Sequence, residues 1–195
     1  MKNYLILLAI ALSFSSCKRL FLIAYGVTQP KVESHSSLSE YAEKKGMNMA
    51  GKFCAPKDST QLYYFLEKIS VPDALIFNAD GHYVDYRESP ESCNANVDGF
   101  IEGLAANDTI KADNTRLAKD MLERLVLLPN NKAITFDSTY DYTIVMTWLK
   151  WTGRTTPEHI IAWQASIEKA EKDGLKIRDL YLNLYYMGFE SDTFK

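Results

Sequence analysis

The sequence predicts an α/β protein in which helices cover both faces of a β-sheet. Residues 143–149 (TIVMTWL) are continuously apolar and β-branched, which is typical of an interior strand buried on both faces. Residues 74–86 hold two strand-like runs on either side of a turn, which indicates a hairpin. Residues 156–173 have apolar side chains at helical spacing. A chain of 195 residues, 47% of them hydrophobic, is long enough to bury one sizeable core.

Helix-start and strand patterns alternate along the first half. Ser37 and Glu40 form a capping box for a short helix that ends at Gly46. Asp58 and Gln61 repeat the capping pattern before a helix with apolar side chains on one face. The other expected elements are a strand over residues 47–54, hairpin arms over 74–77 and 82–86, and a helix over 97–104.

The second half is expected to continue the alternation. Residues 107–114 are polar and turn-rich and are interpreted as a link between two halves of one domain. Thr156 as N-cap and Pro157 at the first helical position open the long helix, and Gly174 lies just beyond its end. The other expected elements are a helix over residues 117–126, a short strand over 133–136 and a strand over 176–186.

The first residues resemble the signal of a bacterial lipoprotein. A short basic start precedes an apolar run over residues 4–14, too short to span a bilayer, and two serines precede Cys17. The resemblance implies cleavage before Cys17, lipid on that cysteine and a location in the cell envelope, anchored to a membrane and facing the periplasm. The pattern departs at Phe14, where the family usually has leucine. The alternative is an uncleaved anchor over residues 4–27, which would place two basic residues near mid-bilayer at about 2.5–3.5 kcal/mol each.

The chain is accordingly divided into three parts. Residues 1–16 are assigned to the signal peptide, residues 17–36 to a tether without sustained periodicity, and residues 37–195 to one folded domain. The formal net charge of −3, with scattered Lys and Arg, gives no basic patch, so no nucleic-acid partner is expected. The three histidines lie far apart and there is no glycine-rich phosphate loop, so neither a metal site nor a cofactor is expected.

The stretch WLKWTGRT (residues 148–155) resembles the active-site segment of the thioredoxin family, in which Trp-x-x-Trp-Cys-Gly-Pro-Cys joins a buried strand to a long helix. Trp148, Trp151 and Gly153 occupy matching positions. Where the family has Cys, Pro and Cys, this chain has Thr152, Arg154 and Thr155. The alternative interpretation is a strand-to-helix connection in some other α/β domain, with the tryptophans as packing residues.

The hairpin region also resembles this family, with Pro72 in the position of its cis-proline and Gly81 in the turn. The two resemblances imply a three-layer thioredoxin-like sandwich with a mixed sheet, and a cis Val71–Pro72 bond. In the family the tryptophan strand precedes the cis-proline strand, whereas here it follows some 75 residues later, so the resemblance implies a circularly permuted order.

Two functions remain open. Threonine cannot supply the thiolate that disulfide exchange requires, so the first hypothesis is a non-catalytic, membrane-tethered module that binds an envelope protein or peptide. The expected binding surface comprises Val71, Pro72, Trp148, Trp151, Thr152, Gly153, Arg154 and Thr155, with Trp148 in the core and Trp151 partly exposed. The alternative is a periplasmic thiol-disulfide oxidoreductase that uses Cys54 and Cys93. The sequence leaves open whether these two cysteines form a disulfide, because it does not give their separation.

Overall fold

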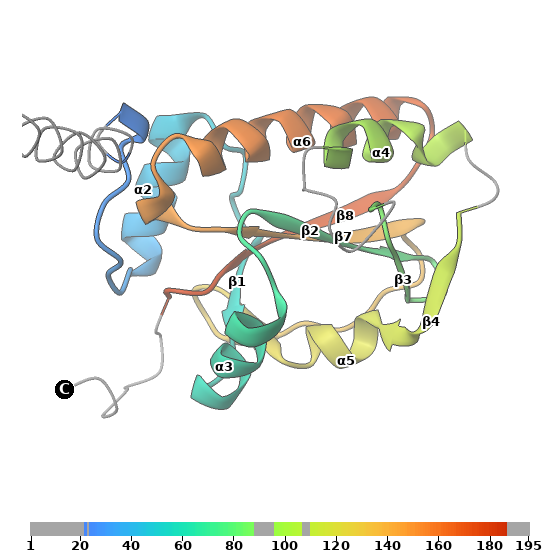
Figure 1. Ribbon diagram of the computed structural model, residues 1–195. Helices are drawn as coiled ribbons and strands as arrows, with labels where there is room; N and C mark the ends of the chain where they lie inside the picture. Colours follow the sequence, from blue (N-terminus) through green and yellow to red (C-terminus); the bar gives the residue numbers. More distant parts are fainter. Residues whose placement is uncertain (1–21, 23, 88–95, 107–109, 187–195) are drawn as a thin grey trace, which may run out of the picture.

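The computed structural model describes residues 22, 24–87, 96–106 and 110–186, which form one mixed eight-stranded sheet with helices on both faces (Figure 1). The strands are β1 (Phe53–Pro56), β2 (Asp73–Asn78), β3 (His82–Val84), β4 (Ala112–Leu117), β5 (Leu125–Leu127), β6 (Lys132–Ala133), β7 (Tyr142–Trp148) and β8 (Ile177–Asn183). The helices are α2 (His35–Lys45), α3 (Ser59–Lys68), α4 (Val97–Gly103), α5 (Ala118–Leu122) and α6 (Thr155–Lys172), with short 3₁₀ turns η2 (Leu104–Ala106) and η3 (Lys150–Thr152). The predicted α/β class is confirmed.

The sheet has the order β4-β3-β2-β7-β8-β1-β5-β6. Its centre is β7, which pairs antiparallel with β2 and parallel with β8. The prediction of an interior strand over residues 143–149 is therefore confirmed, and the strand ends at Trp148. A strand in this position faces helices on both sides, which explains its unbroken apolar sequence.

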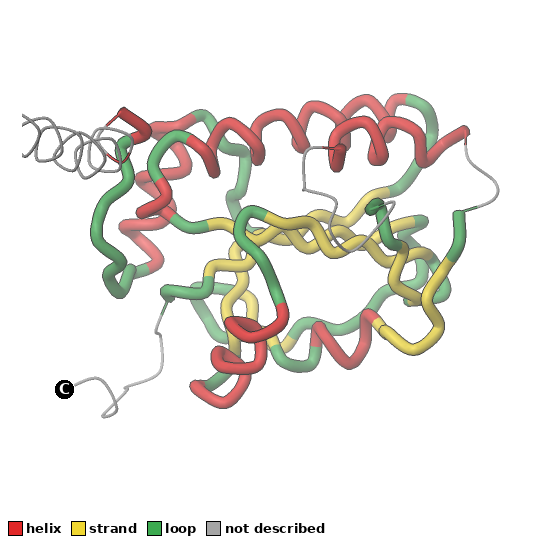
Figure 2. Tube along the Cα trace, in the orientation of Figure 1, coloured by secondary structure: helices red, strands yellow, loops and turns green. Residues whose placement is uncertain are grey.

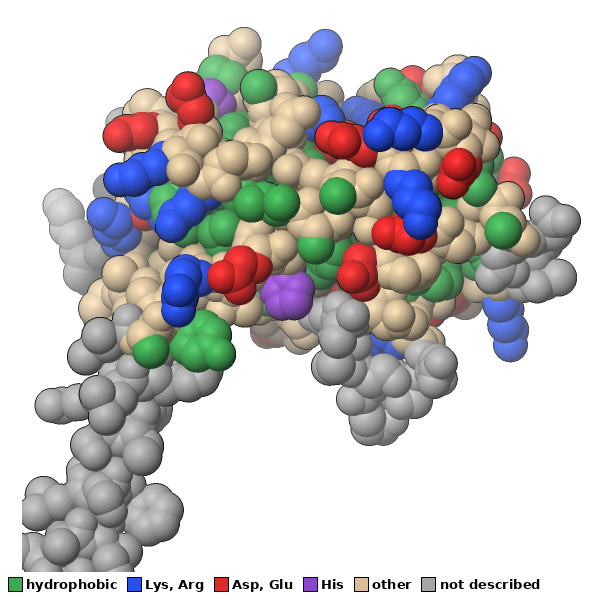
Figure 3. All heavy atoms as spheres, turned by 90° about the horizontal axis from the view of Figure 1, so that it is seen from above, with side chains coloured by type: hydrophobic (Ala, Val, Ile, Leu, Met, Phe, Trp, Pro, Cys, Tyr) green, Lys and Arg blue, Asp and Glu red, His purple; other side chains and the backbone are tan. Residues whose placement is uncertain are grey.

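Two apolar clusters lie on opposite faces of the sheet. Ile144, Met146 and Trp148 of β7 pack with α2, α4 and α6, whereas Val145 packs with α3 and α5. Figure 1 shows α4 and α6 above the sheet and α3 and α5 below it. On the outer side of the α4 and α6 layer, Figure 3 shows Lys and Arg side chains interspersed with Asp and Glu, as on a solvated face.

Several local predictions hold. The Asp58 side chain accepts a hydrogen bond from the Gln61 amide at 2.9 Å and caps α3. Gly46 adopts a left-handed conformation at the end of α2. The hairpin of β2 and β3 is present, with Ile76 opposite Val84.

Other boundaries differ from the predictions. The N-cap of α2 is Ser34, not Ser37, and α6 begins at Thr155 after Arg154, so Thr156 is not its cap. The strand expected over residues 47–54 is short and begins at Phe53, because it extends only where β8 and β5 offer partners.

The region between α4 and β7 was predicted wrongly. Residues 112–114, interpreted as part of a polar link, belong to the edge strand β4, whose polar side chains are largely exposed and whose backbone pairs with β3. The helix expected over residues 117–126 is limited to α5, and residues 125–127 instead pair with β1. Apolar residues three and four positions apart fit a helix, but here the sheet edge offers backbone partners that override this pattern.

Candidate functional site

The turn between β7 and α6 depends on Gly153. This residue has a φ of +72°, in the left-handed region that favours glycine. A Cβ atom there would collide with the carbonyl oxygen of Tyr25 and would lie 2.7 Å from the carbonyl carbon of Gly26. Gly153 therefore makes the tight turn expected of it, and it also permits the close approach of a second chain segment.

That segment is the strap, defined here as residues 24–33. The Arg154 amide donates to the Tyr25 carbonyl oxygen at 2.9 Å, and the Thr28 amide donates to the Trp151 carbonyl oxygen at 2.9 Å. The strap is mostly loop (Figure 2) and is the dark blue segment beside α2 in Figure 1. Residues that the sequence assigns to the tether thus contact the predicted binding turn directly.

The far end of the strap is fixed by a buried carboxylate. Glu33 is 6% exposed and accepts hydrogen bonds from Lys150 Nζ at 3.1 Å and Ser37 Oγ at 2.5 Å. Its amide donates to the Tyr185 carbonyl oxygen at 3.0 Å. The Tyr41 hydroxyl donates to the Gly153 carbonyl oxygen at 3.2 Å, and burial raises the pKa of Tyr41. These contacts join the strap and α2 to the turn.

The two tryptophans have different environments. Trp148 is fully buried, with Tyr41 stacked at 6.4 Å and Phe53 at 5.8 Å between ring centres. Trp151 is partly buried and meets the Tyr185 ring edge-on at 5.9 Å. Trp148 therefore lies in the core as expected, while Trp151 borders the surface.

Thr152 and Thr155 stand where the resembled thioredoxin family has cysteines, and Thr152 contacts its own chain. Thr152 Oγ1 donates to the Leu149 carbonyl oxygen at 2.7 Å and lies 2.5 Å from the Thr156 hydroxyl. Thr155 is the first residue of α6. The Thr152 hydroxyl thus satisfies the Leu149 carbonyl before the helix, as expected of a turn residue, whereas among the described residues no side chain caps the start of α6.

Pro72, in the position of the resembled family's cis-proline, directly precedes β2, the strand that pairs with β7. The Val71–Pro72 bond is cis, as predicted. The strand after it starts with Asp73 opposite Thr147, whose hydroxyl donates to the Ser70 carbonyl oxygen at 2.9 Å. The segment before β2 is thus fastened to the end of β7, one residue before Trp148.

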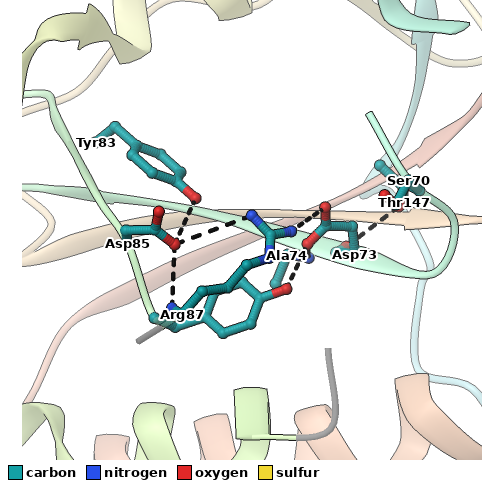
Figure 4. Close-up of polar contacts among 8 residues, drawn as sticks. Ser70, Asp73, Ala74, Tyr83, Asp85, Arg87 and Thr147 are labelled. Carbon is teal, nitrogen blue, oxygen red and sulfur yellow. Dashed lines mark hydrogen bonds and ion pairs between the residues drawn. The ribbon is translucent and has the colours of Figure 1, made fainter. Parts of the chain in front are cut away.

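Asp73 is the centre of a buried polar network that sequence analysis missed (Figure 4). It is 3% exposed, and its carboxylate accepts hydrogen bonds from the Tyr86 hydroxyl at 2.7 Å and Arg87 Nη2 at 2.5 Å. Arg87 also faces Asp85 at 3.9 Å. Burial and the hydrogen bond to Asp73 raise the pKa of Tyr86. The available signal was a lone carboxylate directly after Pro72, at the start of an apolar run.

An apolar groove of about 280 Å³ lies where the strap meets α3 and the end of β8. Three of its side chains are large, apolar and well exposed: Val32 at 57%, Tyr63 at 53% and Leu66 at 47%. Leu184 and Tyr185 also line it. Clustered exposed apolar side chains are typical of contact surfaces.

Cys54 is the one cysteine among the described residues, and it lies in the core. Cys54 is fully buried in β1, and burial raises the pKa of its thiol, so the reactive thiolate is disfavoured. Cys93 and Cys17 lie outside the described residues. The predicted pairing of Cys54 with Cys93 therefore falls outside the described part of the chain, while the burial of Cys54 does not favour the oxidoreductase alternative.

Within the described ranges, no helix combines the length and apolarity needed to cross a membrane, and no three His, Cys, Asp or Glu side chains gather as metal ligands. No protein family, no curated protein and no solved structure matches this chain.

Proposed function

We propose that the protein is a membrane-tethered, non-catalytic thioredoxin-like module that binds an extended segment of a protein partner in the cell envelope. The observation that carries this proposal is the turn after β7, which already holds a second chain segment, the strap, through main-chain hydrogen bonds to Trp151 and Arg154. At the same turn, threonines stand where thiol chemistry would require cysteines.

The thioredoxin-like assignment is supported by the neighbours of the turn. The resemblance requires the strand after Pro72 to lie beside the tryptophan strand, and β2 pairs with β7 along its full length. It also requires a long helix after the turn, the position of α6. The order of these two strands along the chain is reversed relative to the family, which is why the proposal includes a circular permutation.

The apolar groove is the surface on which the partner is proposed to bind. One wall is formed by strap residues that directly follow the part bound to the turn, and the opposite wall by Tyr63 and Leu66 of α3. An extended segment of the partner can place its apolar side chains in this groove while its backbone runs alongside the strap. Lys31 at the rim favours a segment with acidic residues beside its apolar ones.

The proposed lipid on Cys17 would limit the distance between this groove and the membrane. The strap begins seven residues after Cys17, and seven extended residues span at most about 25 Å. The lipid would therefore hold the strap end of the domain close to the membrane, and the partner would meet the groove there.

Site-specific photo-crosslinking in cells tests the proposal. A crosslinkable residue at Leu66 should give discrete adducts with an envelope protein, whereas the same residue at Lys172, at the far end of α6, should not. Val32→Asp introduces a charge into the groove and should remove the Leu66 adduct. Equal adducts from both positions, or a Leu66 adduct that persists with Val32→Asp, would contradict binding in this groove.

A disulfide-reduction assay tests the proposal that the protein is not catalytic. The purified protein should not reduce insulin disulfides, whereas Thr152→Cys with Thr155→Cys should introduce a bridge that can be reduced. Thiol-dependent turnover by the wild-type protein that is lost with Cys54→Ser or Cys93→Ser would favour the oxidoreductase alternative instead.

A further inference from the structure

A second concave site lies on the sheet face that carries α3 and α5, away from the strap. It is a pocket of about 550 Å³, within the usual range for small-molecule sites. Its walls come from two pairs of consecutive elements, α3 with β2 and β4 with α5, which the fold brings together (Figure 1). The proposed peptide-binding function does not use this pocket.

Apolar side chains form its floor. Tyr64, Ile69, Phe77 and Met121 line the pocket; Tyr64 and Ile69 are partly exposed, whereas Phe77 and Met121 are 3% and 8% exposed. They belong to the apolar cluster on this face of the sheet. A ligand that enters the pocket therefore meets an apolar surface beneath its rim.

Cationic side chains form its rim, although the whole chain carries a net charge of −3. Lys68, Arg87, Arg116 and Arg124 line the pocket, together with a single carboxylate, Asp120. Arg87 is already paired with Asp73. Within the described part of the chain, the other three cations have no carboxylate within 4.0 Å.

Aromatic rings hold these cations at the pocket. Lys68 Nζ and the Arg124 guanidinium lie 4.7 and 4.2 Å from the centre of the Tyr64 ring. The Arg116 guanidinium lies 3.4 Å from the centre of the Tyr83 ring, which packs edge-on against Phe77 in the floor. Such contacts orient the charged groups without neutralising them.

Arg124 carries a buried hydrogen-bond donor that the described residues do not satisfy. One of its terminal nitrogens donates to Gln61 Oε1 at 2.6 Å, but its buried Nε has no hydrogen-bond partner among the described residues. A buried donor on a charged group is costly to leave unpaired. A carboxylate or phosphate is the acceptor that best matches a guanidinium.

We propose that this pocket binds a small amphipathic anion, in which a carboxylate or phosphate is attached to an apolar body. The anionic group contacts Lys68, Arg116 and Arg124 at the rim, and the apolar body lies on Ile69 and Met121. Both parts of the ligand contribute, so neither an inorganic anion nor a neutral apolar compound binds comparably.

Isothermal titration calorimetry of the full chain in a neutral detergent tests this, with 1-naphthyl phosphate as the probe. We expect saturable binding that is at least about tenfold tighter than that of inorganic phosphate or of 1-naphthol. 2-Naphthoate separates the two anionic groups: whichever of the two probes binds more tightly identifies the preferred one. Binding should weaken when salt rises from about 0.05 M to about 0.5 M, because the rim is exposed.

Arg116→Gln should weaken binding of 1-naphthyl phosphate about tenfold, since a hydrogen-bonded charge is removed. Lys119→Gln is the matched control, because Lys119 is an exposed cation of α5 that pairs with Glu123 and does not line the pocket. Unchanged thermal unfolding of both variants shows that they fold. No detectable binding, equal binding of 1-naphthol, or an equal loss with Lys119→Gln would each overturn the proposal.

Discussion

Gly153→Ala should detach the strap from the turn. Alanine would have to adopt a φ of +72° with a ψ of −133°, a conformation almost restricted to glycine that costs about 1–3 kcal/mol for another residue. It would also collide with the Tyr25 carbonyl oxygen, so the strap must move away and lose its hydrogen bonds at Arg154 and Thr28. Each such bond contributes about 0.5–1.5 kcal/mol. We expect the free energy of unfolding to fall by about 3 kcal/mol in total.

Gly46→Ala provides a matched control. Like Gly153, Gly46 has a positive φ (+74°), but its ψ of 21° places it in the left-handed helical region, and a Cβ there would meet no atom within 4 Å. Its replacement should therefore cost only the conformational part, about 1–2 kcal/mol. Urea denaturation of the full chain measures both changes.

Hydrogen exchange gives the second readout. Peptides that cover residues 24–33 should exchange faster in Gly153→Ala than in the wild type, and at the wild-type rate in Gly46→Ala. If both variants lose the same stability and the strap stays protected in both, then Gly153 does not hold the strap, and the reasoning is refuted.

Three further predictions concern single side chains. Asp73→Asn removes the buried charge that pairs with Arg87 and should lower the free energy of unfolding by about 3–5 kcal/mol. Asp85→Asn, at a half-exposed carboxylate, should lower it by less than about 1 kcal/mol. Urea denaturation compares the two variants, and equal losses of stability would contradict the buried network. Cys54 should resist a thiol reagent at about pH 8 until the protein unfolds, because its pKa is raised by burial; rapid labelling of native protein at this position would show that the thiol is accessible. Metabolic labelling with a fatty-acid analogue should mark the wild-type protein but not Cys17→Ser, and equal labelling of both would contradict lipidation at Cys17.

The fold could be predicted from sequence where local chemistry and tertiary environment agree. The run of residues 143–149 is apolar on both sides, and only an interior position of a covered sheet suits it. Asp58 followed by Gln61 specifies a helix start through a bond within one turn. In contrast, residues 125–127 fit a helical pattern equally well, and pairing with β1 made them a strand.

For the candidate site, the turn, its glycine and its threonines could be recognised from the sequence, because these properties depend on residues adjacent in the chain. The sequence did not determine that the strap occupies the turn, since the contact between Tyr25 and Gly153 joins residues 128 positions apart. The sequence also did not show that Lys68, Arg116 and Arg124 line one pocket. Such long-range contacts follow from the order of the strands in the sheet, and local sequence patterns do not specify that order.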